Sequence, residues 1–296
     1  MASEELRATI ELMRSQPGIA ADDMSLQEQR DAMEEGQSAL QTPADVGITS
    51  VDLDGVPGRW IEAPGARADA CIVYYHGGGY VMGSLDTHQE LMSRLSRICQ
   101  ARVLGVDYRL APEHLYPAAV EDGVKSYKWL LAQCVSPARI MLAGDSAGGG
   151  LVLATLLSLR QEQTALPAGG ILFSPWTDLT GSGDSVESRA EADPMITGKV
   201  LGEIAATYCG ETNRAEPLVS PVFADLAGLP PLLVQVGDAE ILLDDATRLA
   251  ANAEAAGVEV VYQAWDEAFH VFQAIPHLPE AAEALEQVGN FYKDRV

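Results

Sequence analysis

The sequence has few basic residues for its length and no long uninterrupted apolar run. Lysine and arginine number 19 against 43 aspartates and glutamates, so the formal net charge of the 296 residues is -24. Such an excess of negative charge repels phosphate backbones and anionic lipid, which argues against nucleic acid and membranes as partners. No apolar stretch approaches the roughly 18–20 residues that cross a bilayer. The N-terminal stretch MASEELRATIELMRSQ lacks the apolar core of a signal peptide. We therefore expect a cytoplasmic protein.

Cysteine is scarce as well, and phosphate-binding loops are missing. The four cysteines are scattered without the spacing of a metal site: Cys71, Cys99, Cys134 and Cys209. In a cytoplasmic chain this pattern predicts buried thiols rather than disulfides. The sequence has neither a G-K-S/T loop nor a G-x-G-x-x-G that opens a helix, which argues against a nucleotide site. We expect no metal and no cofactor.

Strands and helices alternate regularly from about residue 48 onward. Apolar residues make up 47% of the chain, enough for a large core. Two strands are predicted around Asp54-Gly55, and further strands in ACIVYYH, ARVLGVDY, RIMLAGD, GGILFSP, PLLVQVGD and VEVVYQAW. Helices are predicted at about 87–98, 117–132, 147–162, 244–256 and 279–293. Most of the strands are near-continuous apolar runs, as in parallel sheets covered on both faces. The pattern predicts a doubly wound α/β sheet.

The first 45 residues contain no strand and are predicted to form two amphipathic helices. The first helix has one apolar face, made of Leu6, Ile10 and Met13. Pro17 and Gly18 separate the helices, and Ser25 with Glu28 forms a capping box at the start of the second. Because these helices have no sheet of their own, we expect them to cover part of the main domain, residues 46–296.

A long insertion interrupts the main domain at about 179–216. It contains a predicted helical stretch near 199–208 and lies between two predicted strands. Insertions of this length usually carry function. Together with residues 1–45, this insertion is predicted to form a mainly helical cap.

The stretch GDSAGGG, residues 144–150, lies where a predicted strand turns sharply into a predicted helix. In a G-x-S-x-G turn the two glycines remove side chains that would clash as the backbone doubles back. The serine hydroxyl is then held out at the carboxyl end of the strand. The alternative interpretation is close packing of a helix on the sheet. The strand–turn–helix context favours Ser146 as a nucleophile.

A serine nucleophile needs backbone donors for the oxygen that becomes negative, and YYHGGGY at 74–80 offers them. Three glycines after a strand leave N–H groups open to a ligand, and placed beside the serine they form an oxyanion hole. The alternative is a flexible turn. His76 precedes the glycines and is expected to brace their loop.

The general base is predicted to be His270, which follows the last strand in WDEAFHVF. In α/β-hydrolases the chain order is serine, acid, histidine. His88 and His114 precede Ser146 in the sequence, and His277 lies between prolines and is expected near the surface.

The acid should follow the strand PLLVQVGD, where four candidates occur: Asp238, Glu240, Asp244 and Asp245. Asp244 and Asp245 start a helix, where carboxylates are favoured by the helix dipole and by capping. The residues alone leave Asp238 and Glu240 open.

These motifs together resemble the hormone-sensitive-lipase family of α/β-hydrolases, in its bacterial esterase branch. The resemblance rests on HGGG at 76–79, DYRLAPEHLYPAA at 107–119, GDSAGG from 144 and the final histidine segment. It covers about residues 50–296. It implies an α/β-hydrolase catalytic domain with a mostly parallel eight-stranded sheet flanked by helices, and a mainly helical cap. It also suggests a homodimer, with VEVVYQAW pairing at a sheet edge.

The resemblance implies roles for individual residues. Ser146 would be the nucleophile and His270 the base, while Gly78, Gly79 and Ala147 would donate the oxyanion-hole N–H groups. The family usually carries its acid in an Asp-Pro-Leu-x-Asp pattern, but this chain has Glu240-Ile-Leu-Leu-Asp244. We therefore predict that Glu240 is the acid, with Asp238 as the alternative. Tyr108, Arg109 and Glu113 are expected to be structural, with an ionised pair locking their loop.

The predicted function is a serine carboxylesterase acting on small, short-acyl esters. The alternatives are a lipase for longer acyl chains and a ligand-binding relative without catalysis. The nine acidic residues within 1–40 argue against an oil-facing cap. The side chains expected to narrow the acyl pocket lie in or beside the motif loops: Tyr80, Met82, Trp176, Ile241 and Phe272.

Overall fold

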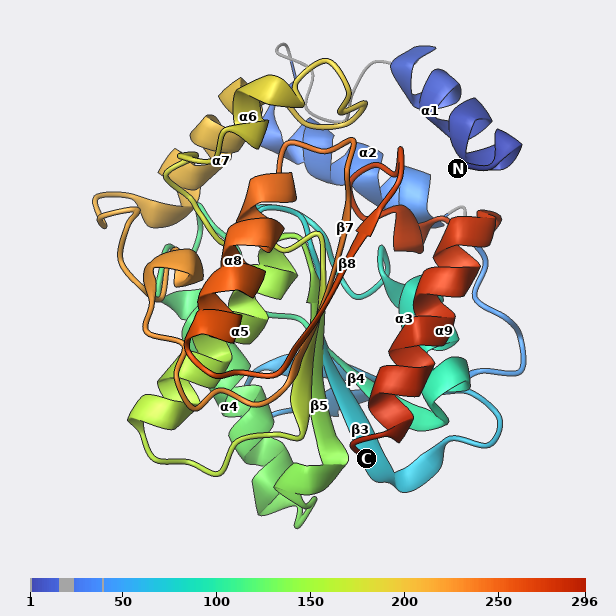
Figure 1. The fold of residues 1–296 in the computed structure, drawn as a ribbon. Helices are drawn as coiled ribbons and strands as arrows, with labels where there is room; N and C mark the ends of the chain where they lie inside the picture. Colours follow the sequence, from blue (N-terminus) through green and yellow to red (C-terminus); the bar gives the residue numbers. More distant parts are fainter. Residues whose placement is uncertain (1, 16–23, 39) are drawn as a thin grey trace.

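The computed structural model describes residues 2–15, 24–38 and 40–296 (Figure 1). Its centre is an eight-stranded sheet in the order β1-β2-β4-β3-β5-β6-β7-β8. The strands are β1 Gly47–Asp52, β2 Pro57–Glu62, β3 Arg67–Tyr75, β4 Ala101–Val106, β5 Ile140–Asp145, β6 Gly169–Phe173, β7 Leu232–Gly237 and β8 Val260–Trp265. The pairs β1–β2 and β2–β4 are antiparallel, and the other pairs are parallel. The predicted mostly parallel eight-stranded sheet is confirmed.

Helices cover both faces of the sheet because the strand residues alternate between two cores. On β3, Val73 and Tyr75 join the cluster beneath α4, α5 and α8, whereas Ile72 and Tyr74 join the cluster beneath α3 and α9. The flanking helices are α3 Gln89–Cys99, α4 Ala118–Ala132, α5 Ala147–Gln161, α8 Leu243–Ala255 and α9 Pro279–Lys293. Two-sided burial explains the unbroken apolar runs of the inner strands, and the predicted strands and helices are confirmed.

In the described part of the chain, four further helices lie beyond the carboxyl ends of the parallel strands (Figure 1). They are α1 Glu4–Ser15, α2 Leu26–Ser38, α6 Ser185–Ser188 and α7 Gly198–Cys209, and short 3-10 helices lie at Pro137–Arg139, Pro221–Phe223 and Phe272–Ala274. The capping box of α2 is present, since the Ser25 N–H donates to Glu28 Oε2 at 2.7 Å and the Glu28 N–H to Ser25 Oγ at 3.3 Å. Pro17 and Gly18 lie outside the described residues.

The apolar face of α1 packs on the segment that follows β8 and on α9. Leu6 is fully buried, with Ile10 and Met13 packed alongside, against a cluster that includes Phe269 and Phe272. The N-terminal helix therefore covers the loop that carries His270, and the predicted apolar face of α1 is confirmed.

The prediction of buried thiols is wrong for one cysteine. Cys71, Cys99 and Cys209 are buried, but Cys134 is exposed in the left-handed turn that follows α4. Burial raises the pKa of the Cys71 and Cys99 thiols to about 12, so both are poor nucleophiles. No helix in the described part of the chain combines the length and apolarity that a bilayer crossing requires.

Candidate active site

Ser146 lies on a sharp turn between β5 and α5. Its φ of 53° and ψ of -120° belong to a strained conformation for a non-glycine residue. The turn is so tight that a Cβ at position 148 would stand 1.9 Å from the carbonyl oxygen of Tyr75. Only glycine fits at this position, which explains Gly148. The strand–turn–helix prediction is confirmed, and Ser146 stands at the carboxyl end of the central strand.

Glu240 and His270 are joined by a short hydrogen bond. His270 Nδ1 lies 2.5 Å from Glu240 Oε2, and both side chains are buried. The remaining oxygen, Glu240 Oε1, accepts the Gly237 N–H and the Ser174 hydroxyl, each at 2.7 Å. A carboxylate held by fixed donors orients the imidazole and selects the tautomer with hydrogen on Nδ1. Nε2 is then free to accept a proton.

Asp238 has a different position and a different task. Its Oδ1 accepts the N–H of Glu267 at 2.8 Å, which closes the turn after β8. Between the two acids that the residues alone left open, the geometry therefore favours Glu240 as the partner of His270.

The charge on Glu240 changes the basicity of His270. Burial lowers the pKa of His270, but the carboxylate of Glu240 and its hydrogen bond raise it more. Asp193 and Asp145 also raise this pKa, and the net result is a raised value. An imidazole of raised pKa is a stronger base in its neutral form.

The glycine loop after β3 presents free backbone donors. Gly78 has φ of 108°, and a Cβ there would meet the Met82 carbonyl oxygen at 2.2 Å. The Gly78 carbonyl accepts the N–H groups of Val81 and Met82, which closes the loop into a tight turn. Within the described residues, no hydrogen bond uses the N–H groups of Gly78, Gly79 or Ala147. These are the three donors that the resemblance implies for an oxyanion hole.

The sequence of this chain is similar to those of known hydrolases. A family model described as an alpha/beta hydrolase fold matches residues 72–274. The chain belongs to the α/β-hydrolase family. An acetyl-hydrolase of Streptomyces hygroscopicus is 42% identical over 236 residues, 79% of each chain. An esterase of Acinetobacter venetianus is 40% identical over 248 residues, 83% of this chain and 82% of its own.

Solved structures agree with this assignment. An esterase from the bacterial hormone-sensitive lipase family has a TM-score of 0.96 and 44% identity, covering 100% of this chain and 99% of its own. The esterase EstE5, soaked with p-nitrophenyl butyrate, has a TM-score of 0.96 and 43% identity, covering 99% of each chain. The resemblance of this α/β-hydrolase to hormone-sensitive-lipase esterases is confirmed.

Sequence reasoning missed a buried polar cluster beneath the glycine loop of this α/β-hydrolase. Asp145 Oδ1 accepts the Gly77 N–H at 3.0 Å and the Tyr74 hydroxyl at 2.6 Å, while His88 Nε2 lies 3.3 Å from Asp145 Oδ2. Burial lowers the pKa of His88, but the carboxylate of Asp145 raises it more, so the net pKa is raised. Asp145, the residue before Ser146, thus ties the glycine loop to the turn that carries the serine. The only sequence signal was the acidic neighbour of the serine.

His76 braces the loop as expected. Its Nδ1 lies 2.7 Å from the Gly77 carbonyl oxygen, and its own carbonyl accepts the Tyr108 hydroxyl. Burial lowers the pKa of His76 to about 4, so this imidazole is neutral at pH 7. His277 is exposed, as predicted.

Arg109 and Glu113 both form ion pairs after β4, but with residues from other elements rather than with each other. Arg109 binds Asp122 at 2.8 Å, whereas Glu113 binds Arg30 of α2 at 2.7 Å. Arg30 also donates to the carbonyl oxygens of Val81 and Ala111. The second helix therefore holds the glycine loop, and no motif in the sequence pointed to Arg30.

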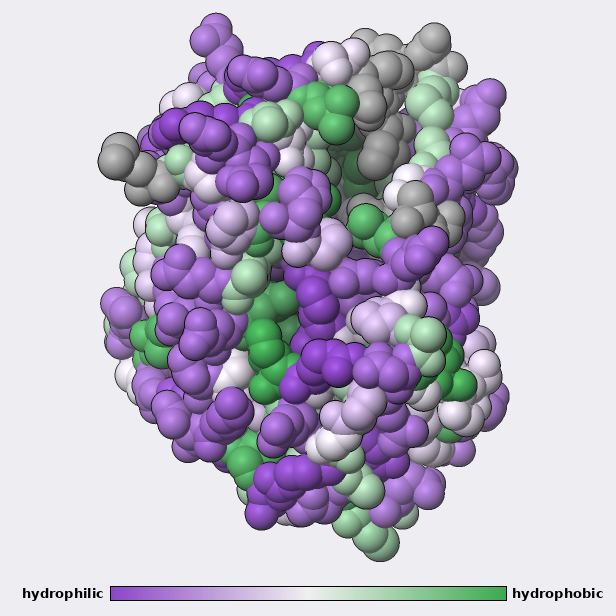
Figure 2. Space-filling view, turned by 90° about the vertical axis from the view of Figure 1, so that its right-hand side faces the viewer, coloured by the Kyte–Doolittle hydropathy of each residue, from purple (hydrophilic) through white to green (hydrophobic). Residues whose placement is uncertain are grey.

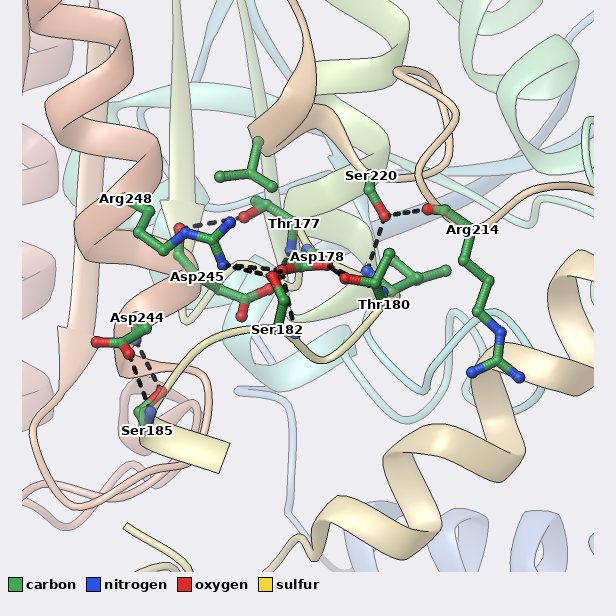
Figure 3. Close-up of polar contacts among 12 residues, drawn as sticks. Thr177, Asp178, Thr180, Ser182, Ser185, Arg214, Ser220, Asp244, Asp245 and Arg248 are labelled. Carbon is green, nitrogen blue, oxygen red and sulfur yellow. Dashed lines mark hydrogen bonds and ion pairs between the residues drawn. The ribbon is translucent and has the colours of Figure 1, made fainter. Parts of the chain in front are cut away.

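Asp244 and Asp245 bind the segment that follows β6 (Figure 3). Asp245 Oδ2 accepts the N–H groups of Thr177 and Asp178, both at 2.7 Å, and Asp244 Oδ2 accepts the Ser185 N–H at 2.9 Å. Burial raises the pKa of Asp245 to about 8. These acids attach the segment to the start of α8.

The predicted pocket residues fall into two groups. Tyr80, Met82, Trp176 and Ile241 are buried in one cluster, whereas Phe272 packs with Trp265 beneath α1, with ring centroids 5.4 Å apart. The ring of Tyr80 stacks on Tyr208 of α7 at 3.9 Å. Packing gives no support to Phe272 as a pocket residue. Within the described residues, no group of three histidine, cysteine or acidic side chains could hold a metal ion.

Proposed function

We propose that this α/β-hydrolase is a serine carboxylesterase in which Ser146, His270 and Glu240 form the catalytic triad. The hydrogen bond of 2.5 Å between His270 and Glu240, at the same sheet edge as the Ser146 turn, carries the proposal. No hydrogen bond joins Ser146 Oγ to His270 in the structure described, and such contacts often tighten only when substrate is bound. The related acetyl-hydrolase and esterases support the reaction type.

The mechanism follows from these positions. His270 Nε2 takes the proton of Ser146 as Oγ bonds to the ester carbonyl carbon. The N–H groups of Gly78, Gly79 and Ala147 stabilise the oxygen that becomes negative. His270 then gives its proton to the departing alkoxide, which leaves as the alcohol. A water activated by His270 attacks the acyl-enzyme, so the acid is released and Ser146 regains its proton.

We propose short-acyl esters as the substrates and residues 1–45 and 179–216 as the cap. Tyr80, Met82, Trp176 and Ile241 are the side chains proposed to narrow the acyl pocket. On the face that Figure 2 shows, hydrophilic residues cover most of the surface, and apolar ones occupy a narrow central strip and smaller areas. This face offers no broad apolar area for an oil interface. A cytoplasmic location and a homodimer through the edge strand β8 stay predictions.

The acyl preference is tested with p-nitrophenyl esters of increasing chain length. We expect kcat/KM to be highest between acetyl and hexanoyl esters, because the buried rings of Tyr80 and Trp176 would leave little room for longer chains in the proposed acyl pocket. Emulsified long-chain triglyceride should be a poor substrate. Faster turnover of the emulsion than of soluble butyrate would identify a lipase instead, and no turnover of any ester would point to a ligand-binding protein.

The cap proposal is tested by deleting residues 1–45 and, more sharply, by Arg30→Gln. Deletion should impair activity or solubility, because it uncovers the loop of His270 and removes the donor to Val81. Arg30→Gln should lower kcat/KM by about tenfold, since small displacements of catalytic donors are costly. The matched control is Arg67→Gln, because Arg67 pairs with Asp69 at an exposed site outside the proposed cap. Unchanged kinetics after the deletion of residues 1–45, or after Arg30→Gln, would contradict the proposal.

A further inference from the structure

The segment 179–216 binds both backbone groups of Ile241, the residue that directly follows Glu240. The N–H of Ile241 donates to Asp193 Oδ2 at 2.9 Å, and the carbonyl of Ile241 accepts the Ser185 hydroxyl at 2.6 Å. Ile241 is fully buried, so both of its backbone groups depend on this segment for hydrogen bonds. The orientation of the peptide after Glu240 is therefore set by two side chains from the cap segment.

The two side chains are themselves held in place. Asp193 Oδ1 accepts the N–H groups of Met195 and Ile196, at 2.8 and 3.0 Å. Ser185 exchanges hydrogen bonds with Asp244, which Figure 3 shows as two contacts between the residues. A carboxylate that accepts three backbone N–H groups has a defined orientation.

The contact between Asp193 and Ile241 requires an N–H group at position 241. The hormone-sensitive-lipase pattern usually has proline after its acid, and proline has no N–H to donate. This chain has isoleucine there. The N–H donor at position 241 therefore exists because this chain departs from the family pattern. The same departure places glutamate instead of aspartate at position 240.

Asp193 also contributes charge to the site. The acidic groups that act on His270 come from three parts of the fold: Glu240 after β7, Asp193 in the cap segment and Asp145 at the end of β5. All three raise the pKa of His270, against the lowering effect of burial. Removing the charge of Asp193 removes one of these contributions.

We infer that Asp193 is a positioning residue that couples the cap segment to Glu240 and His270 through the N–H of Ile241. The inference rests on the proposed function, since it concerns the geometry of the proposed triad. It predicts that the cap does more than limit substrate size, because part of it sets the position of the acid.

Three variants separate this role from a local structural one. An asparagine at position 193 can keep the oxygen that binds Met195 and Ile196, but its amide group cannot accept the Ile241 N–H, and the charge is lost. Asp193→Ala removes every contact. Asp184→Asn is the matched control, because Asp184 is an exposed acid of the same segment whose side chain makes no capping bond. Each variant is assayed for kcat and KM with p-nitrophenyl butyrate across pH 5–9 (about 0.5-unit steps), and for stability by urea unfolding.

We expect Asp193→Asn to lower kcat by about tenfold with little change in KM, because the loss concerns the transition state. The acidic limb of kcat/KM should move to lower pH by roughly 0.3–1 unit, because the imidazole loses a stabilising negative charge. Asp193→Ala should be at least as impaired, and Asp184→Asn should match the unaltered protein. If Asp193→Asn matches Asp184→Asn in kcat and in pH profile, the inference is overturned, even where Asp193→Ala is impaired.

A second background tests the hydrogen bond directly. Ile241→Pro removes the donor, so adding Asp193→Asn to it should lower kcat much less than Asp193→Asn does alone. Equal effects in both backgrounds would overturn the role of the Ile241 N–H. Glu240→Gln distinguishes a failure of the proposed triad from a failure of the proposed role of Asp193. An active Glu240→Gln overturns the proposed triad together with this inference, whereas an inactive Glu240→Gln beside fully active Asp193 variants overturns the inference alone.

Discussion

Ser146→Ala is expected to lower kcat for p-nitrophenyl butyrate by roughly 10⁶, since removing a serine nucleophile from a triad costs about this much. The fold should survive, because alanine removes only the hydroxyl from a turn whose shape depends on the neighbouring glycines. A residual acceleration of about 10³–10⁴ over water is expected from the remaining backbone donors. Steady-state kinetics and urea unfolding of the variant provide the two measurements.

A covalent probe gives the control for this experiment. A fluorophosphonate should bond through phosphorus to Ser146 Oγ with loss of fluoride, adding one equivalent to the unaltered protein and none to Ser146→Ala. Ser188→Ala, which changes an exposed serine of α6, should label and turn over normally. Labelling of a residue other than Ser146, with Ser146→Ala still active, would show that the nucleophile has been misassigned.

Glu240→Gln is expected to lower kcat by about 10⁴, because the neutral amide neither stabilises the imidazolium nor selects the productive tautomer. Asp238→Asn should have a small effect, because an asparagine oxygen can still accept the N–H of Glu267. Glu240→Asp provides an intermediate test. The aspartate side chain is one methylene shorter than that of glutamate. Its carboxylate would lie farther from His270 Nδ1 than the present 2.5 Å, so partial activity is expected.

The pH dependence of these variants has a defined direction. His270 must be neutral to accept a proton, so activity rises with pH through its pKa. The raised pKa places this rise above the ordinary histidine value of about 6.5. Loss of the Glu240 charge lowers the pKa, so residual activity should persist to lower pH. If Asp238→Asn is the inactive variant and Glu240→Gln is active, the acid has been misassigned while the esterase proposal stands.

The contacts of α1 and α2 show where sequence reasoning was sufficient and where it was not. The apolar face of α1 and the capping box of α2 follow from spacing within a few residues, and both were predicted. The contacts of Arg30 with Val81 and Ala111 span 51 and 81 residues. They could not be predicted, because nothing local to α2 indicates which loop it will meet.

The same distinction applies to the site. Neighbouring residues determine the turn at Ser146, the glycine loop and the order of strands and helices, because backbone conformation and side-chain alternation are local properties. The choice between Glu240 and Asp238 depends on which carboxylate reaches His270, 30 residues away from Glu240. The support from Ser174 to Glu240 crosses 66 residues, and that from Asp193 to Ile241 crosses 48. Such partners are selected by the packing of strands β6 and β7 and the cap segment, so they become visible only when the chain is folded.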